Sequence, residues 1–311
     1  MDTAASIGVV LTLLSPIPGV TRTTGLVRPA EMVGQTAPMT STATHDTADD
    51  APVLVRVLDG IATITLNRPD AMNGLDLRTK EALLAAVQQV GEDDSARCVV
   101  LTGSGRAFCV GQDLKEHLQG LKGDTSIPLS DTVGRHYNPI VHALATMPKP
   151  VVAAVNGVAA GAGASLAFAA DFRVLVDSAG FNTAFAGVAL SCDTGASWSL
   201  PRLVGRAKAM ELLYFPRTIS AAEALELGLA TQVVPAADFE ATVGELATRL
   251  AAGPTVAFGA IRRAVTNSAA SSLEDALAFE ADMMALTGGS ADHRAAVDAF
   301  VAKEKPVFEG R

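Results

Sequence analysis

The amino-acid sequence predicts an α/β fold that continues into a helical C-terminal region. Three observations lead to this prediction: short apolar runs typical of buried strands, amphipathic stretches between them, and a helical pattern over about the last sixty residues. A chain of 311 residues, 49% of them hydrophobic, is long enough to bury a large core. Its net charge of −9 argues against nucleic acid and anionic membrane surfaces as partners.

Strands and helices alternate in the first part of the expected core. Two β runs within 53–67 are joined by Asp59 and Gly60, a pair typical of two-residue hairpins. Apolar residues then recur at helical spacing over 76–90. Further along we expect a buried strand at 98–103, a mobile polar loop at 115–134, a helix at 133–147 with Pro139 at or near its first turn, and strands at 150–155 and 171–178.

After Ala179 the pattern is mostly helical. Ser220 and Glu223 match a capping box and Gly228 a C-cap, so they bound one helix. More helices are expected at 238–252, 255–267, 272–286 and 292–303. The chain is thus divided into an N-terminal extension (1–51) that is disordered or dispensable, a core (52–253) and a helical region (254–311).

The extension has the composition of a linker. Its apolar stretch leaves a targeting role open, and Met39 is an alternative start of translation. Three cysteines, Cys98, Cys109 and Cys192, are an odd number without the spacing of metal ligands. We therefore expect reduced thiols, a cytoplasmic protein and no metal site.

Two glycine-rich loops follow predicted strands, at 101–116 and 156–171. The second contains Gly161 and Gly163, but it lacks the third glycine and the later acidic residue of a dinucleotide-binding loop. No Gly-Lys-Ser/Thr sequence for a phosphate-binding Walker loop occurs. Two such loops can instead direct two backbone N–H groups at one carbonyl oxygen that becomes negative during a reaction.

Six segments occur in a characteristic order: "NRPDAMNGLD", "GSGRAFCVGQDLKE", "KPVVAAVNGVAAGAGASLAFAAD", "LPRLVGRAKAMELL", "ISAAEALELGLATQVV" and "ADHRAAVDAFVAKEKPVF". They resemble the motifs of the crotonase (enoyl-CoA hydratase/isomerase) superfamily over about residues 53–308. The resemblance implies a spiral of ββα units with a helical C-terminal trimerisation region. It also implies a homotrimer or a dimer of trimers, an acyl-CoA substrate, and no cofactor besides the coenzyme A of that substrate.

The resemblance also assigns binding residues. The oxyanion hole would consist of the N–H groups of Gln112 and Ala162. The coenzyme A adenine would lie near Met72, Asp113 and Leu114, with phosphate contacts from Arg68 and from Lys303 of a neighbouring subunit. For Arg68 the alternative is an ordinary solvated charge beside a turn, and the sequence leaves both interpretations open.

Hydratases of this family need two carboxylates, and this sequence has Ser165 and Phe185 at the matching positions. A serine hydroxyl is not a competent acid or base at neutral pH without a partner. Isomerisation is therefore favoured over hydration. Tyr137 and Asn138, together with Ser165 and Phe185, are expected to line the acyl pocket.

One acidic residue, Asp193, remains in "FNTAFAGVALSCDTGASW". Taken alone it is more typical of a helix N-cap, but its apolar neighbours favour an acid/base whose pKa is raised by burial. The segment is similar to the ring-1,2-epoxyphenylacetyl-CoA isomerase group, in which an aspartate at this position transfers the proton. Relatives have a proline where Cys192 stands and often a glycine at Ala189.

The function expected is thus an acyl-CoA isomerase that shifts a double bond or rearranges a ring through an enolate. Two alternatives remain open: an enoyl-CoA hydratase with an atypical active site, and a non-catalytic acyl-CoA-binding member of the fold. An aryl-CoA dehalogenase is less favoured, because its histidine base would be replaced by Asn138.

Overall fold

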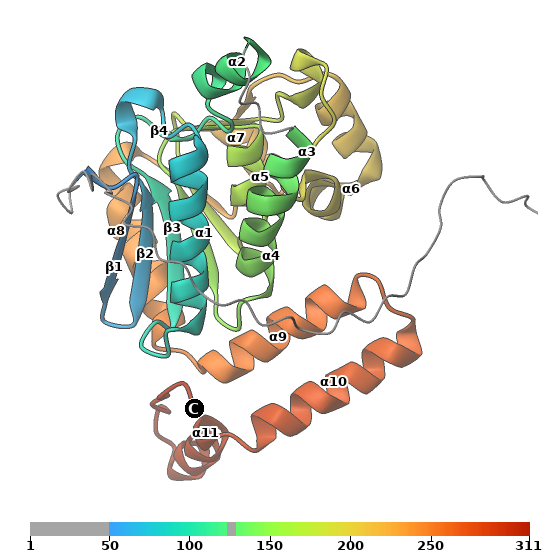
Figure 1. Ribbon diagram of the computed structural model, residues 1–311. Coiled ribbons are helices and arrows are strands. Elements are labelled where there is room, and N and C mark those ends of the chain that lie inside the picture. The colour runs from blue at the N-terminus through green and yellow to red at the C-terminus, as the bar shows by residue number, and fades with distance from the viewer. Residues whose placement is uncertain (1–49, 123–128) are drawn as a thin grey trace, which may run out of the picture. The chain divides into compact units, whose positions relative to one another are not determined.

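A computed structural model describes residues 50–122 and 129–311 of the protein. Its larger sheet has six strands in the order β1-β2-β3-β5-β7-β10 (Figure 1). Only β1 and β2 pair antiparallel, and each other neighbouring pair is parallel. The strands are β1 (Val53–Leu58), β2 (Ile61–Leu66), β3 (Cys98–Gly103), β5 (Val151–Val155), β7 (Phe172–Val176) and β10 (Gln232–Val234).

The predicted hairpin between β1 and β2 is confirmed. Asp59 and Gly60 have φ angles of 50° and 77°, the left-handed values that a two-residue type I′ turn needs at both positions. The strand predicted at 98–103 is β3, and it is buried on both faces. Val99 and Leu101 belong to the main hydrophobic cluster, whereas Cys98 and Val100 belong to a second cluster beneath another helix.

A smaller sheet has the order β4-β6-β8-β9. Its strands are β4 (Ala107–Cys109), β6 (Val158–Ala160), β8 (Gly180–Asn182) and β9 (Ile219–Ser220). The prediction of a mostly helical chain after Ala179 missed β8, β9 and β10. Strands of two or three residues are too short for an alternating pattern to emerge from the sequence.

A ββα unit recurs along the chain. Strands β3, β5 and β7 of the larger sheet are each followed by a strand of the smaller sheet, namely β4, β6 and β8. Helices α2 (Leu114–Lys122), α5 (Ala162–Phe168) and α6 (Ala196–Tyr214) then follow in turn. This is the repeating unit that the family resemblance implies.

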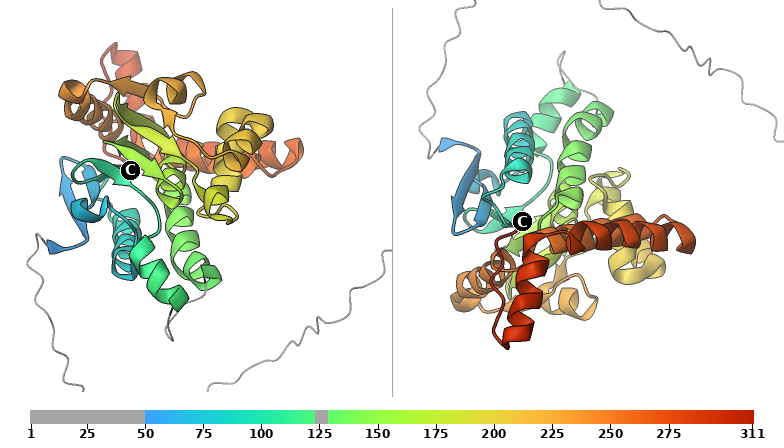
Figure 2. Two further views of the ribbon diagram at one scale, coloured as in Figure 1. Left: turned by 90° about the horizontal axis from the view of Figure 1, so that it is seen from above. Right: turned by 90° about the horizontal axis from the view of Figure 1, so that it is seen from below.

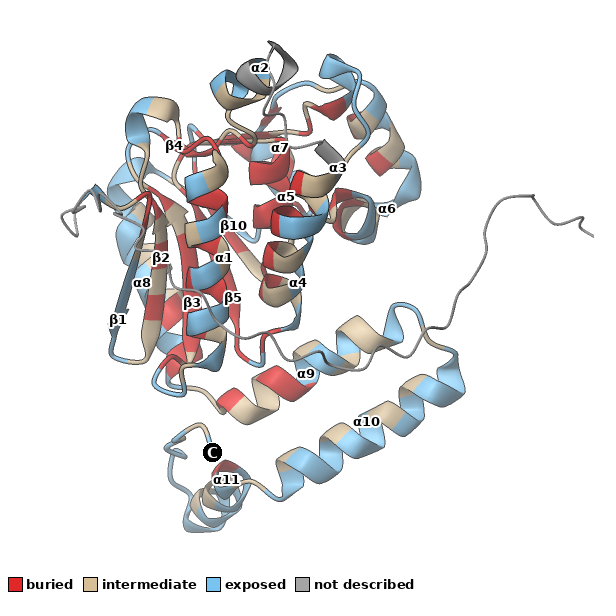
Figure 3. Cartoon of the chain, viewed as in Figure 1, coloured by how far each residue is buried: buried red, intermediate tan, exposed pale blue. Residues whose placement is uncertain are grey.

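Helices cover both faces of the larger sheet (Figures 1 and 3). On one face lie α1 (Leu77–Glu92) and α4 (Asn138–Thr146), and on the other lies α8 (Ala236–Ala251). Leu83 and Val87 of α1 are fully buried in the main cluster, and Ala247 of α8 is buried in the second. The helix predicted at 76–90 therefore has its apolar face on the sheet.

The polar loop predicted at 115–134 is wrong at both ends. Residues 114–122 form α2, because Asp113 accepts hydrogen bonds from the N–H groups of Lys115 (2.9 Å) and Glu116 (3.2 Å) and so caps the helix. Residues 129–132 form α3 (Leu129–Thr132). The part at 123–128 lies outside the described residues.

A π-helical turn, η3 (Val133–Tyr137), leads from α3 into α4. Pro139 lies in the first turn of α4, as predicted. Proline has no N–H to donate, and its ring crowds the carbonyl four residues earlier. The wider π-helical turn leaves room for the proline ring. In this turn the Asn138 N–H donates to Val133 O, five residues back.

The remaining helices agree with the predicted positions to within a few residues. They are α7 (Ala221–Glu226), α8, α9 (Thr255–Ser268), α10 (Leu273–Gly288) and α11 (Ala291–Ala302). The predicted cap of α7 is confirmed, since Ser220 Oγ accepts from Glu223 N at 3.2 Å. Short 3-10 turns, η2 (Pro69–Ala71) and η4 (Phe185–Val188), stand between the larger elements.

The C-terminal region, α9–α11, runs along one side of the core (Figure 2). Arg262 ties α9 to the core through Asp171 (2.8 Å) and the carbonyl of Leu144 (2.9 Å). In contrast, α10 has no buried residue. Within residues 50–122 and 129–311, none of the helices combines the length and the apolar character that crossing a membrane requires.

Candidate active site

The two glycine-rich loops meet where Gly111 lies against the start of α5. A Cβ atom at Gly111 would be 2.9 Å from Ala160 O and 3.2 Å from Ala162 N. Its φ of +82° is a value that side chains other than glycine rarely adopt. Close approach and left-handed backbone thus both require glycine here, and they bring Gln112 next to Ala162.

Neither of the two N–H groups predicted for the oxyanion hole is used in the hydrogen bonds of a helix or a strand pair. Ala162 is the first residue of α5, so its N–H has no acceptor inside the helix. Gln112 forms a parallel bridge with Leu75, in which Leu75 N donates to Gly111 O (2.8 Å) and Asp113 N donates to Leu75 O (3.2 Å). In such a bridge the N–H of Gln112 itself points to the opposite side.

Ser165 and Phe185 stand at the two positions where the family resemblance implies carboxylates in hydratases. Ser165 is 1% exposed, and its hydroxyl donates to Gly161 O at 3.0 Å. The hydroxyl therefore braces the glycine turn that precedes Ala162. Phe185 is buried and begins η4. Neither residue offers an ionisable group.

Asp193 is not a helix N-cap, so that alternative interpretation is wrong. Helix α6 begins at Ala196 with Gly195 as its N-cap residue, and no side chain caps it. Thr194 and Gly195 have φ angles of 51° and 75°, and this turn separates Asp193 from the helix. The carboxylate instead accepts a hydrogen bond from Thr194 Oγ1 at 2.8 Å.

Burial raises the pKa of the Asp193 carboxyl above its ordinary value, although the Thr194 hydrogen bond opposes this shift. A carboxyl with a raised pKa both accepts and returns protons more readily near neutral pH. Of the apolar neighbours noted in the sequence, Val188, Leu190 and Trp198 are themselves exposed by 64%, 43% and 40%. The burial of Asp193 therefore does not depend on these three side chains being buried themselves.

Tyr137 contacts the oxyanion loop and lies within the electrostatic reach of Asp193. Its ring is 2% exposed, and its hydroxyl donates to Gln112 Oε1 at 2.6 Å. Burial raises the pKa of Tyr137, and the nearby charge of Asp193 raises it further. Gly195 packs on Val141 of α4, the helix that directly follows Tyr137 in the chain. The adjacent Asn138 is exposed.

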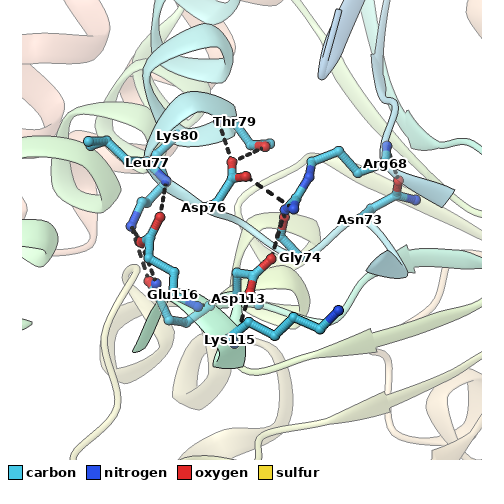
Figure 4. Close-up of polar contacts among 12 residues, drawn as sticks. Arg68, Asn73, Gly74, Asp76, Leu77, Thr79, Lys80, Asp113, Lys115 and Glu116 are labelled. Atoms are coloured by element: carbon cyan, nitrogen blue, oxygen red, sulfur yellow. Dashed lines mark hydrogen bonds and ion pairs between the residues drawn. The ribbon is translucent and has the colours of Figure 1, made fainter. Parts of the chain in front are cut away.

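Arg68 bridges two carboxylates near the start of α1 (Figure 4). Its guanidinium contacts Asp113 Oδ2 at 3.0 Å and Asp76 Oδ2 at 3.1 Å, and it also donates to Gly74 O. Burial raises the pKa of Asp113, but the hydrogen bonds from Glu116 N, Arg68 and Lys115 N outweigh it and hold the pKa below its usual value. Arg68 thus has a structural role, and its contact with a phosphate stays a prediction.

The other predicted coenzyme A contacts lie in two places. Met72, with a φ of 51°, and Leu114, 67% exposed, lie near Asp113 at the start of α2. Lys303 is the exposed C-cap residue of α11. Figure 1 places α2 and α11 at opposite ends of the core, so Lys303 can reach a ligand at α2 only from another copy of the chain.

Two residues of this site, Lys80 and Glu116, were missed in the sequence. Lys80 is 1% exposed, and its ammonium contacts Glu116 Oε1 at 2.9 Å and Gln112 Oε1 at 3.3 Å. A signal was present, because Lys80 falls between Leu77 and Leu84 at helical spacing, on the apolar face of α1. A lysine there must find a buried partner.

Comparison with known proteins identifies the family of the chain. A model of the enoyl-CoA hydratase/isomerase family matches residues 56–311. The 1,2-epoxyphenylacetyl-CoA isomerase of Escherichia coli (strain K12) is 42% identical over 259 residues, which cover 83% of this chain and 98% of that protein. A protein of Rhodobacter capsulatus named "Probable enoyl-CoA hydratase" is 43% identical over 255 residues, covering 82% and 96%.

Solved structures share the architecture as well. The crystal structure of enoyl-CoA hydratase from Bacillus anthracis is 32% identical, covers 84% of this chain and 100% of its own, and superposes with a TM-score of 0.78. The family match, the identity to whole-length relatives and the common fold all lead to one assignment. The chain belongs to the enoyl-CoA hydratase/isomerase family, whose fold is that of the crotonase superfamily.

Proposed function

We propose that the protein is an acyl-CoA isomerase, which shifts a double bond or rearranges a ring of a coenzyme A thioester. The observation that carries this proposal is the contrast between Asp193 and the two hydratase positions. Asp193 is a partly buried carboxyl with a raised pKa, whereas Ser165 and Phe185 supply no carboxylate at all. One acid/base suffices to move a proton between two carbons, but hydration by the family route uses two.

In the proposed reaction, the Asp193 carboxylate removes a proton from C2 of a 3-enoyl-CoA. The electron pair of that C–H bond moves into the thioester, whose oxygen becomes negative in a dienolate. The N–H groups of Gln112 and Ala162 hold this oxygen, and each such donor contributes roughly 100- to 1000-fold to the rate in comparable enzymes. Protonated Asp193 then returns the proton to C4, which leaves a 2-enoyl-CoA and the original carboxylate.

The proposal also covers partners and location. We place the coenzyme A moiety of the substrate against Met72, Asp113 and Leu114, with no separate cofactor or metal. A cytoplasmic location suits Cys98 and Cys109, whose thiols are buried and free, with pKa values raised by burial to about 12.

We further propose that other copies of the chain cover the C-terminal helices, as a trimer or a dimer of trimers. Several large apolar side chains of this region are exposed in one protomer: Ile261, Val265, Leu273, Leu277, Met284, Leu286, Val297, Phe300 and Val301. Exposed apolar surface on this scale is typical of an interface.

The experiment uses purified protein, a 3-enoyl-CoA and deuterated water. We expect a 2-enoyl-CoA product, detected by the absorbance of the conjugated thioester. Mass spectrometry should also detect deuterium in the product, to the extent that protonated Asp193 exchanges with solvent before it returns the proton. Asp193→Asn should abolish both. Asp177→Asn, which changes an exposed aspartate after β7, is the matched control and should retain both.

Other outcomes identify the alternatives. Full activity in Asp193→Asn would overturn the acid/base assignment. Binding of acyl-CoA with neither isomerisation nor exchange would favour a non-catalytic binding protein. Rapid hydration of a 2-enoyl-CoA would show that the argument from Ser165 and Phe185 is wrong and that the protein is a hydratase with an atypical site.

A further inference from the structure

We propose that Lys80 and Glu116 are positioning residues for this reaction. They hold the side chain of Gln112, and through it they fix the direction of the Gln112 backbone N–H in the oxyanion hole. This inference rests on the proposed function, because it gives a role to an N–H group that the function assigns.

Three elements converge on the Gln112 side chain. Lys80 reaches it from α1, Glu116 from the first turn of α2, and Tyr137 from η3. Glu116 also accepts from the Leu77 N–H at the start of α1 through its second oxygen, at 2.6 Å. In Figure 4 dashed lines connect Glu116 to both Leu77 and Lys80, so this carboxylate joins α2 to α1.

The charges of this cluster determine which way the Gln112 amide faces. A lysine ammonium only donates hydrogen bonds, and an ionised glutamate only accepts them. The Gln112 oxygen therefore faces Lys80 (3.3 Å), and its nitrogen donates to Glu116 Oε1 (3.0 Å). The Tyr137 hydroxyl must then be the donor in its 2.6 Å contact with the same Gln112 oxygen.

The cluster compensates for the freedom of the preceding residue. Gly111 has no side chain and adopts a φ of +82°, so its own side chain does not restrict the next peptide group. The carbonyl of that peptide group accepts from Leu75 N at 2.8 Å, and the Asp113 N–H donates to Leu75 O at 3.2 Å. The Gln112 side chain adds a further anchor, because its two polar atoms are held from three directions. With both sides anchored, the Gln112 N–H is confined to one direction before substrate arrives. Such preorganisation is what makes an oxyanion hole effective.

Because Lys80 is buried, its ammonium depends on the charge of Glu116. Lys80 is 1% exposed and also lies 5.9 Å from the centre of the Tyr137 ring. Replacing Glu116 by glutamine removes its countercharge and turns one acceptor oxygen into an amide donor. That donor would face Lys80, Gln112 Nε2 or Leu77 N, each of which also donates. The cluster would then have to rearrange, and the Gln112 amide would lose its fixed orientation.

The test combines kinetics with a readout that needs no turnover. The variants are Lys80→Met, Glu116→Gln and Tyr137→Phe, with Glu81→Gln as the control, since Glu81 is the exposed neighbour of Lys80 on α1. The probe is a cinnamoyl-CoA carrying a 4-dimethylamino group. Its absorption shifts to longer wavelength when its thioester oxygen accepts hydrogen bonds, so the shift on binding reports on the oxyanion hole itself.

We expect Lys80→Met and Glu116→Gln to lower kcat by about 10- to 100-fold, with KM nearly unchanged, because small displacements of a catalytic donor have effects of this size. The absorption shift of the bound probe should shrink in both variants. Tyr137→Phe should reduce the absorption shift less, because this change removes only one of the contacts to the Gln112 side chain. Glu81→Gln should match the wild type in every measurement.

The results separate this inference from the proposed function. A wild-type protein that shifts the probe but does not isomerise would refute the function and leave the positioning role intact. Folded variants with an unchanged shift and unchanged kcat would refute the positioning role. If Lys80→Met does not fold, Glu116→Gln decides, because the Glu116 side chain is 36% exposed and glutamine keeps its shape.

Discussion

Gly163 packs directly on the carbonyl group of Cys109, so closely that a Cβ atom at Gly163 would lie 2.1 Å from the Cys109 oxygen. Gly163 is the second residue of α5, and Cys109 is the last residue of β4. This contact sets the distance between the two loops that carry Gln112 and Ala162. The glycine is therefore required by the close approach of two backbones.

We expect Gly163→Ala to cost about 1–3 kcal/mol of unfolding free energy and most of the isomerase activity, because overpacking must push β4 and α5 apart. Gly91→Ala is the matched control. Gly91 lies inside α1, and its Cβ would meet no atom within 4 Å. That change should stabilise the protein by about 0.5–1 kcal/mol. Chemical denaturation checks both, and equal destabilisation by the two changes would contradict the packing argument.

Asp193→Asn should make the protein more stable at neutral pH while removing activity. The pKa of Asp193 is raised in the folded protein, so its contribution to stability is complete only below the unfolded pKa of about 4 and is lost as pH rises through the folded value. Asparagine does not titrate. The melting temperature of the variant should therefore exceed that of the wild type increasingly as pH rises above about 4.

Thermal unfolding from pH 4 to pH 8 provides this measurement. Asp177→Asn serves again as the control, because the exposed Asp177 should leave the pH dependence unchanged. A difference between wild type and Asp193→Asn that stays constant over this range would contradict a raised pKa.

The sequence predicted the larger elements well, because they have strong periodic patterns. The hairpin at Asp59 and Gly60, the buried strand β3 and the helices after Ser220 all follow from local signals. The smaller sheet was missed, since its strands have two or three residues and their pairing partners lie far away in the chain. Helix α2 was missed because its cap by Asp113 and its docking through Glu116 are contacts that the polar composition hides.

For the site, too, the features with a local sequence signal were predicted, and the features that depend on contacts between distant residues were not. The order of motifs indicated which loops meet, and the structure does bring Gly111 against Ala162. The sequence left open whether Asp193 caps a helix, because the answer depends on the φ angles of Thr194 and Gly195. The Lys80–Glu116 pair joins residues 36 positions apart, and only the packing of α1 against α2 reveals it.

Arg68→Met should destabilise the protein by about 1–3 kcal/mol, since it leaves the partly buried Asp76 and Asp113 without their shared partner. Binding assays then separate this structural role from the predicted phosphate contact. If Arg68 also binds the 3′-phosphate of coenzyme A, the variant should lose affinity for an acyl-CoA but not for its 3′-dephospho analogue. Equal losses for both ligands would leave only the structural role.

Charges on the exposed face of α10 should break the proposed oligomer without unfolding the protomer. Leu277 and Met284 lie two turns apart on α10, are 54% and 72% exposed, and belong to a helix with no buried residue. We expect Leu277→Glu/Met284→Glu to sediment as a monomer with unchanged helical content, because both side chains are more than half exposed in one protomer. Asp282→Asn, on another face of the same helix, is the control and should sediment like the wild type. Lys303 is predicted to reach coenzyme A only from another copy, so the monomeric variant should also have a higher KM for acyl-CoA. A wild type that sediments as a monomer at micromolar concentration would contradict both the oligomer and the shared site.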